Sequence, residues 1–219
     1  MPIPDAINDE QAVGAMVHGL TAHYLVNDAH KLKAGETALV HAAAGGVGLL
    51  LVQMARAVGA RVIGTASSPE KAQLAREAGA EEVIVFTQQD FESEVKRLTG
   101  GKGVDVVYDG VGKATFDKNL NVMRLRGMLV LYGVSSGPVP PVDPARLSEK
   151  GSLYMARTTL AHFTATREEL LARTSALFNM MEHGKLTMRI GKAYPLAEAA
   201  QAHRDMEGRH LVGKQLLIP

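Results

Sequence analysis

Residues 41–48 read His-Ala-Ala-Ala-Gly-Gly-Val-Gly, and this stretch decides the fold. The apolar segment Thr37–Ala42 leads into it and is predicted to be a buried strand. Gly45–Val58 follows, and its apolar residues recur at the spacing of a helix that packs one broad face on a core. Gly59 is placed to end that helix in the left-handed conformation. A glycine-rich turn therefore joins a strand directly to a helix.

The same strand-and-helix unit repeats along the chain. Further strands are predicted at Arg61–Thr65, Glu82–Phe86, Val104–Tyr108 and Gly127–Tyr132, and further helices at Pro69–Ala78, Asp90–Leu98 and Lys113–Val122. Strands that alternate with helices of about ten residues favour right-handed crossovers and a parallel sheet. We therefore predict an α/β fold, a doubly wound, mostly parallel Rossmann sheet with helices on both faces.

The ends of the chain depart from this rhythm. A helix is predicted over Asp9–Asn27, with Asn8 or Asp9 at its N-cap, and Ser135–Arg146 is predicted to be a loop. The remaining predicted elements are a strand at Ser152–Leu160, helices at Thr166–His183 and Leu196–Met206, and a closing strand at Gln215–Ile218. Thr166 and Glu169 form a capping-box pattern. We predict a dinucleotide-binding domain over residues 1–195 and a separate C-terminal helix and strand over 196–219.

Composition narrows the class of protein. The 219 residues carry a formal net charge of +1, so charge gives no reason to expect nucleic acid or a membrane surface as the main partner. The chain has no cysteine, which excludes disulfides and thiolate-bound zinc, and no metal site is expected. No signal peptide and no apolar run of about 18 residues is present. We expect a soluble, cytoplasmic protein.

The glycine-rich turn carries the chemistry. Ala43-x-Gly45-x-x-Gly48 is the dinucleotide fingerprint with alanine at its first position, and it lies after a strand and opens a helix, as that motif requires. Gly45 lets the backbone approach a pyrophosphate, and unpaired N–H groups of the helix would face the anion. The turn residues predicted to bind the cofactor are Ala44, Gly45, Gly46 and Val47. The alternative is a tight turn in a fold that binds nothing.

The end of the second predicted strand indicates which dinucleotide binds. NAD sites usually place an acidic residue about 20 residues after the glycines, to hold the ribose hydroxyls. Residues 64–67 read Gly-Thr-Ala-Ser, with Lys71 one turn into the next helix, and offer no such acid. We therefore predict NADPH, with its 2′-phosphate on Ser67 and Lys71. The alternative makes Lys71 a solvated surface lysine and Ser67 a helix cap, and Glu70 also argues against a bound phosphate.

Four segments together resemble a known family. Residues 19–24, 41–48, 107–112 and 213–219 are similar to the zeta-crystallin-like quinone oxidoreductases, the zinc-free branch of the medium-chain dehydrogenase/reductase superfamily. The resemblance covers essentially the whole chain. It implies a GroES-like domain ahead of the first helix, which would supply much of the substrate site. It also implies that residues 196–219 return to that catalytic domain.

The resemblance extends the set of cofactor-binding residues. It implies that Thr21 and Tyr24 contact the nicotinamide–phosphate end, and that Tyr132 lies near the nicotinamide. Phe86 stands where the family commonly has a tyrosine beside the adenosine. The resemblance also places Gly110, Val111 and Lys214 at the cofactor, although Lys214 fits an edge-strand lysine nearly as well.

The expected function is hydride transfer from NADPH to a quinone or a conjugated enone. The cofactor supplies that chemistry, and no catalytic acid or base can be assigned from the sequence. His18, His23 and His41 are interpreted as structural histidines whose polar atoms are satisfied. The alternative function is a binding module that holds NADPH without turnover, because its substrate domain is missing. An apolar strand at Gly127–Tyr132, expected at the sheet edge, favours pairing with a second strand. The resemblance implies that two nucleotide domains join at that edge, so we predict a homodimer.

Overall fold

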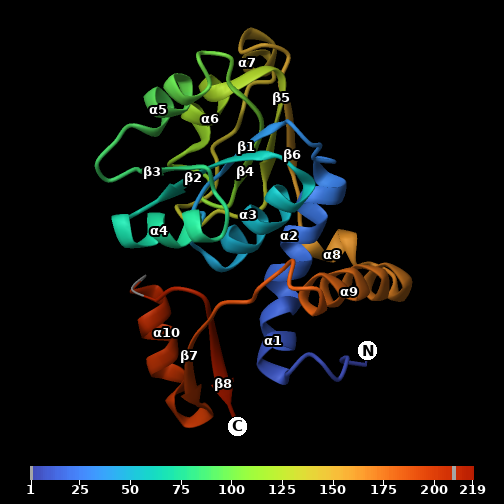
Figure 1. Ribbon diagram of the computed structural model, residues 1–219. Coiled ribbons are helices and arrows are strands. Elements are labelled where there is room, and N and C mark those ends of the chain that lie inside the picture. Colours follow the sequence, from blue (N-terminus) through green and yellow to red (C-terminus); the bar gives the residue numbers. More distant parts are fainter. Residues whose placement is uncertain (1, 209–210) are drawn as a thin grey trace.

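A computed structural model describes residues 2–208 and 211–219 of the chain. Its main body is built on six strands, β1 (Thr37–Val40), β2 (Arg61–Ala66), β3 (Glu82–Val85), β4 (Val104–Asp109), β5 (Met123–Leu131) and β6 (Tyr154–Arg157). All neighbouring pairs run parallel, in the order β3-β2-β1-β4-β5-β6 (Figure 1). This order is that of the doubly wound dinucleotide-binding sheet, so the predicted fold class is confirmed.

Helices cover both faces of the sheet. The connecting helices are α3 (Gly46–Val58), α4 (Pro69–Glu77), α5 (Phe91–Leu98) and α6 (Phe116–Val122). Leu50, Leu51 and Met54 of α3 belong to one buried cluster, while Phe91 of α5 and Leu120 of α6 belong to another. Figure 1 shows α3 and α4 on one side and α5 and α6 on the other. As predicted, Pro69 begins α4, and Gly59 ends α3 with a φ of 87°.

The N-terminal helix is one continuous rod with two wider turns. It passes through α1 (Asp9–Gly14), the π-helical η1 (Ala15–Gly19), α2 (Leu20–Tyr24) and the π-helical η2 (Leu25–Ala29). Asn8 caps it with the reciprocal bonds of a capping box. The long helix α9 (Arg167–Glu182), opened by the predicted Thr166–Glu169 box, packs against it. A Cβ at Gly19 would lie 3.2 Å from Leu177, so the small residue permits the close approach.

The edge of the sheet differs from the prediction. Strand β5, which contains most of Gly127–Tyr132, lies between β4 and β6 and is therefore interior. The edge strand is β6, with Tyr154 60% exposed and Met155 39% exposed. The sequence pattern identified a strand near 152–160 but carried no information on its neighbour. The short helices α7 (Ala145–Glu149) and α8 (Leu160–Phe163) on either side of β6 were not predicted.

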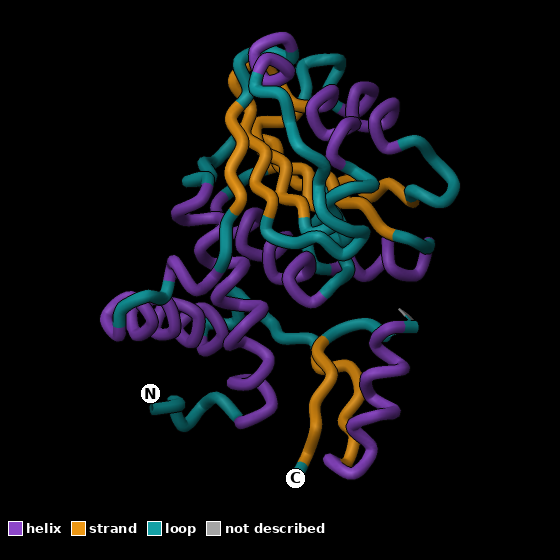
Figure 2. The backbone as a smooth tube through the Cα atoms, turned by 180° about the vertical axis from the view of Figure 1, so that it is seen from behind, coloured by secondary structure: helices purple, strands orange, loops and turns teal. Residues whose placement is uncertain are grey.

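A small second unit follows at the C-terminus. Strands β7 (Ile190–Pro195) and β8 (Lys214–Ile218) pair in parallel, joined by η3 (Leu196–Glu198) and α10 (Ala199–Glu207). Figure 2 shows this unit below the main sheet, beside the N-terminal helix. The predicted boundary at 195 grouped residues 190–195 with the nucleotide-binding domain, whereas their pairing groups them with the C-terminal segment. Only Tyr194 of β7 is buried. The strand therefore lacks the alternation of buried and exposed residues that would mark it in the sequence.

In the part of the chain that the structure describes, no helix is both long and apolar enough to span a membrane. The cytoplasmic location expected from the sequence stays a prediction.

Candidate functional site

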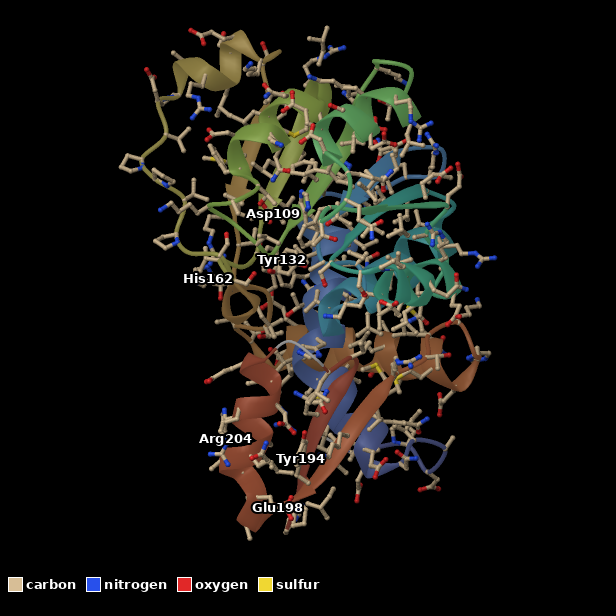
Figure 3. All side chains as sticks on the ribbon, turned by 90° about the vertical axis from the view of Figure 1, so that its left-hand side faces the viewer. Asp109, Tyr132, His162, Tyr194, Glu198 and Arg204 are labelled. Carbon is tan, nitrogen blue, oxygen red and sulfur yellow. The ribbon has the colours of Figure 1, made fainter. Side chains whose placement is uncertain are left out.

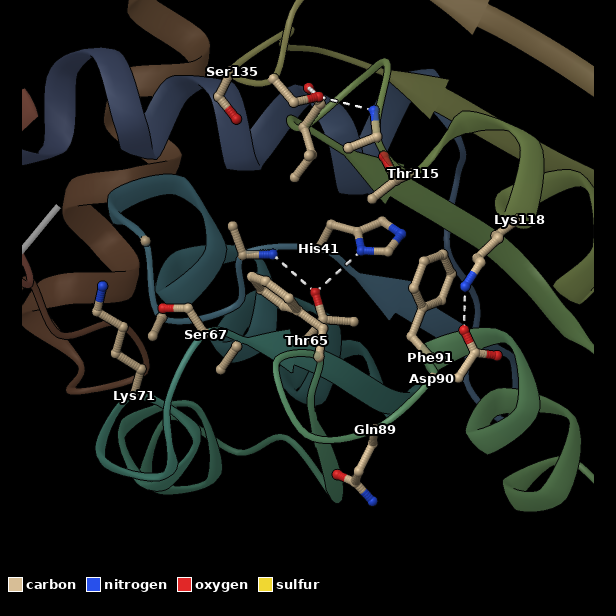
Figure 4. A pocket seen from close by; sticks show the side chains of 18 of the residues that line it. His41, Thr65, Ser67, Lys71, Gln89, Asp90, Phe91, Thr115, Lys118 and Ser135 are labelled. Carbon is tan, nitrogen blue, oxygen red and sulfur yellow. Dashed lines mark hydrogen bonds and ion pairs between the residues drawn. The ribbon is translucent and has the colours of Figure 1, made fainter.

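A cleft opens at the carboxyl ends of the parallel strands, where the order of the sheet reverses between β1 and β4. Its cavity volume is about 540 Å³. Ala44 and Gly45 line it after β1, Ser67 after β2 and Val111 after β4. Figure 4 shows side chains from these loops facing one common space. Open α/β sheets bind their ligands at this topological switch point.

The turn after β1 is held in a tight, strained shape. Ala42 adopts a φ of 50°, in the left-handed region that non-glycine residues rarely enter. Its carbonyl accepts a 2.8 Å hydrogen bond from the Gly45 N–H, which closes the turn. A Cβ at Gly48 would stand 2.3 Å from the same carbonyl oxygen, so only glycine fits there. The turn is thus as close to α3 as the backbone allows.

The N-terminus of α3 faces this turn with no side-chain cap. Its N-cap is Gly45, which has no side chain to accept hydrogen bonds from the first-turn N–H groups. Such N–H groups, together with the positive end of the helix dipole, form a site for an anion. The end of the helix at Gly45 thus has the features of an anion site, and binding of a pyrophosphate by Gly45, Gly46 and Val47 stays a prediction.

Ser67 after β2, Lys71 in α4 and Phe86 after β3 all line the cleft, and Figure 4 shows Ser67 beside Lys71. The cap of α4 is Ser68, whose hydroxyl accepts the Lys71 N–H at 3.3 Å. Ser67 is therefore not the helix cap, contrary to the alternative interpretation, and its exposed side chain lines the cavity. Phe86 is 50% exposed, which leaves an aromatic face open to the cleft rim. A hydroxyl, an ammonium and an aromatic face suit an adenosine phosphate.

A buried polar network runs beneath the turn, and the sequence analysis did not identify it. His41 Nδ1 lies 3.1 Å from Thr65 Oγ1, and His41 Nε2 lies 2.7 Å from Asn119 Oδ1. The Asn119 amide donates to Asp109 Oδ2 at 2.8 Å. Burial lowers the pKa of His41, which outweighs the opposing effects of Asp109 and Asn119. His41 is thus a satisfied, neutral histidine, as interpreted, and its ring also contacts Phe91 edge-on at 4.9 Å.

Several residues predicted at the cofactor do not line this cleft. The Tyr24 hydroxyl lies 3.1 Å from Thr158 Oγ1, its ring stacks on Phe163 at 4.2 Å, and its side chain is buried. Tyr132 packs on Gly110, where a Cβ would come within 2.9 Å of the ring. Figure 3 shows Tyr132 beside Asp109, whose carbonyl accepts the Tyr132 N–H at 2.9 Å. The predicted cofactor-binding residues that do not line the cleft are Thr21, Tyr24, Gly46, Val47, Gly110, Tyr132 and Lys214. Their contact with an extended ligand stays a prediction.

His18 differs from the sequence interpretation. Its Nδ1 is buried and has no hydrogen-bond partner among the described residues. The ring stands over the glycine turn, because a Cβ at Gly46 would be 2.3 Å from Nδ1. Burial, and then the charge of Lys214, lower the pKa of His18 from 6.5 to about 4. His18, Gly46 and Lys214 line a second, much smaller cavity.

Loops after the other strands, helices α5 and α6, and two residues of the C-terminal unit, Met206 and Leu211, complete the main cleft. The residues that sequence analysis missed there include Gln89, Asp90, Phe91, Ala114, Thr115, Lys118, Ser135, Ser136, Met206 and Leu211. Asp90 forms an ion pair with Lys118. The hydrogen bond from Lys118, and then the one from the Ser93 N–H, lower the pKa of Asp90 to about 2. Asp90 was predicted only as the start of a helix. Its position after a parallel strand was the signal that could have placed it at the cleft.

Comparison with known proteins agrees with this geometry. The family model described as "Zinc-binding dehydrogenase" matches residues 46–176. A quinone oxidoreductase of Pseudomonas aeruginosa is 46% identical over 99% of this chain and 67% of its own length. A 2-haloacrylate reductase of Burkholderia is 44% identical over 97% of this chain and 64% of its own. The structure of Escherichia coli quinone oxidoreductase complexed with NADPH matches with a TM-score of 0.97 and 42% identity, covering 100% of this chain and 68% of that one.

The fold and cleft define a dinucleotide-binding domain of the Rossmann type. The chain belongs to the quinone oxidoreductase family, within the broader zinc-binding dehydrogenases. It spans about two thirds of the length of the curated relatives it matches. The broader family's name mentions zinc, but the residues of this chain do not fit a zinc site. The described residues contain no cluster of three His, Cys, Asp or Glu side chains that could hold a metal ion, and the chain has no cysteine.

Proposed function

We propose that the cleft binds NADPH and that the protein reduces a quinone or a conjugated enone with it. The observation that carries this proposal is the pairing of two anion-binding features in one cavity. One is the uncapped N-terminus of α3 at Gly45, and the other is the acid-free end of β2 with Ser67 and Lys71. They would hold the pyrophosphate and the 2′-phosphate respectively.

The chain's own residues position the cofactor. The turn at Ala44 and Gly45 fixes the pyrophosphate, and Phe86 offers its face to the adenine. Val111 borders the cavity after β4, so the nicotinamide half would extend toward Gly110, Tyr132 and Tyr24. When bound, NADPH supplies the hydride. No acid or base of this chain is assigned to the reaction.

The substrate class follows from what the relatives have in common. A quinone and a 2-haloacrylate both present a carbon–carbon double bond conjugated to an electron-withdrawing group, which accepts hydride readily. One relative named for a quinone and another named for a 2-haloacrylate are each similar to this chain over nearly its whole length. This supports an acceptor of that electronic type, a small molecule, as the substrate.

The decisive experiment separates binding from turnover. Titration of the chain with NADPH and with NADH, followed by cofactor fluorescence, should give a clearly tighter complex with NADPH. Addition of a quinone to the complex should then consume NADPH. Cofactor binding without quinone reduction would favour the alternative of a binding module, whereas equal affinity for NADH would contradict the roles of Ser67 and Lys71.

We further propose that the protein is a homodimer that pairs through β6. An edge strand presents unpaired N–H and C=O groups, and this one also exposes Tyr154 and Met155. The proposed contact therefore lies on β6 and not at Gly127–Tyr132.

The C-terminal unit, from Ile190 onward, would pack on a catalytic domain of the kind that the family resemblance implies. Its exposed Leu196, Leu217 and Ile218 are apolar surface that such a domain would cover.

A further inference from the structure

His41 has no part in the function proposed above, yet it is 1% exposed and lies directly beneath the phosphate-binding turn. It is the residue immediately before Ala42, whose left-handed backbone begins the turn. Burying an imidazole costs free energy unless both ring nitrogens are hydrogen-bonded, whereas an apolar residue at this position would carry no such cost. The hydrogen bonds around it give the reason.

The network starts from a fixed carboxylate. The Asp109 oxygens accept hydrogen bonds from the N–H groups of Val111 and Gly112, at 2.6 and 3.1 Å. They also accept from the Thr115 hydroxyl at 2.7 Å and from the Asn119 amide at 2.8 Å. Because Asp109 only accepts, the amide of Asn119 has its NH₂ group toward Asp109. Its carbonyl oxygen is therefore turned toward His41.

The direction of every remaining bond then follows. Asn119 Oδ1 can only accept, so His41 Nε2 carries the proton and donates across 2.7 Å. The neutral ring leaves Nδ1 as an acceptor, so the Thr65 hydroxyl donates to it across 3.1 Å. The Thr65 oxygen is then free to accept the Ala42 N–H at 3.2 Å. Figure 4 shows the two bonds that meet at the Thr65 hydroxyl.

We propose that Thr65, His41 and Asn119 are positioning residues, whose one-way hydrogen-bond chain holds Ala42 in the shape that receives the cofactor's phosphates. These hydrogen bonds link the two walls of the cleft, the loop after β4 and the turn after β1. Asp109 fixes the loop of Val111 after β4, while Thr65 fixes the turn after β1. A dinucleotide lies across these two walls, so their spacing sets its affinity. This inference rests on the proposed binding of NADPH.

A pair of substitutions at Thr65 tests the proposal. Thr65→Val keeps the shape but removes the hydroxyl, which leaves the Ala42 N–H and His41 Nδ1 unpaired, while Thr65→Ser keeps the hydroxyl. We expect NADPH to bind roughly tenfold more weakly to Thr65→Val and nearly normally to Thr65→Ser. The matched control is Thr174→Val, because Thr174 is equally buried but donates to Leu170 O in α9, away from the cleft. It should lower the melting temperature without changing the NADPH affinity.

The tautomer of His41 provides a second readout that does not depend on the cofactor. Nitrogen-15 NMR of the wild-type chain at pH 7 should show a neutral ring with its proton on Nε2. In Thr65→Val, the backbone amide signals of residues 42–48 should shift, whereas in Thr174→Val they should stay in place. A proton on Nδ1, a charged ring, or wild-type NADPH affinity in Thr65→Val would overturn the proposal. A wild-type chain that binds no NADPH but shows this tautomer and these shifts would instead contradict the proposed function.

Discussion

The carbonyl oxygen of Ala42 lies so close to the first turn of α3 that a Cβ at Gly48 would stand 2.3 Å from it. The same Cβ would be 2.8 Å from the Cα of Ala43. Both contacts are with backbone, which cannot move aside as a flexible side chain can. We therefore expect Gly48→Ala to lower the free energy of unfolding by about 1–3 kcal/mol, as measured by urea denaturation. NADPH binding should be lost with it, because the turn must shift.

Gly45→Ala is the matched control within the same turn. Gly45 has an ordinary φ of −76°, and its Cβ would lie 3.1 Å from Ala42 O. Because this contact is much looser than the 2.3 Å contact at Gly48, alanine at Gly45 should destabilise the fold less than alanine at Gly48, while the added methyl group would obstruct the approach of the pyrophosphate. Wild-type stability in Gly48→Ala, or unchanged NADPH affinity in Gly45→Ala, would contradict this account of the turn.

Lys71→Ala tests the choice of cofactor. Lys71 lines the cleft beside Ser67, where an ammonium would pair with a 2′-phosphate that NADH lacks. We expect the dissociation constant for NADPH to rise roughly tenfold or more, and that for NADH to stay near its wild-type value. Fluorescence titration with each cofactor measures both. Lys185→Ala, an exposed lysine after α9, should change neither constant, and an equal loss for both cofactors in Lys71→Ala would remove the 2′-phosphate from the site.

The stability of the protein should fall in mild acid because of His18. The unfolded chain takes up a proton near pH 6.5, whereas folded His18 stays neutral until about pH 4. The unfolded state therefore binds more protons across this window, and the free energy of unfolding decreases as the pH falls through it. Above pH 6.5, His18 is neutral in both states and costs no stability. Near pH 4, its protonation in the unfolded state lowers the free energy of unfolding by roughly 2–3 kcal/mol. The lowered pKa values of His23 and His41 act in the same direction.

Urea denaturation of wild type and of His18→Gln between pH 4 and 7 measures this contribution. Glutamine cannot take up the proton, so the dependence of stability on pH should be shallower in the variant. His162→Gln, at an exposed position in α8, serves as the control and should follow the wild type. A variant curve parallel to that of wild type would exclude His18 as a source of the pH dependence.

The sequence predicted what depends on local periodicity and missed what depends on distant neighbours. The apolar runs and helix caps near Gly59, Pro69 and Thr166 were sufficient for the Rossmann sheet. The position of β6 at the edge, and the pairing of β7 with β8, are set by contacts between remote segments. For the same reason His41 gave no sign of Asn119, which lies 78 residues away. The alternative interpretation considered only Ser67 as a cap, whereas the hydroxyl of Ser68 accepts the Lys71 N–H and caps α4.

The edge strand provides the last test, which concerns assembly. Tyr154 and Met155 are 60% and 39% exposed on β6, and the backbone of an edge strand can pair with a second copy. Met155→Glu places a charge at the centre of this edge. We expect wild type to have the mass of a dimer in sedimentation, and Met155→Glu to dissociate toward the monomer with its melting temperature little changed.

Leu196→Glu distinguishes loss of the specific edge from a general effect of added charge. Leu196 is 56% exposed, comparable to Tyr154, but it lies in the C-terminal unit, away from the main sheet. This variant should remain dimeric, because the proposed contact involves β6 alone. A monomeric wild type would contradict the dimer itself. A Leu196→Glu variant that dissociates while Met155→Glu stays dimeric would move the interface from the sheet edge to the C-terminal unit.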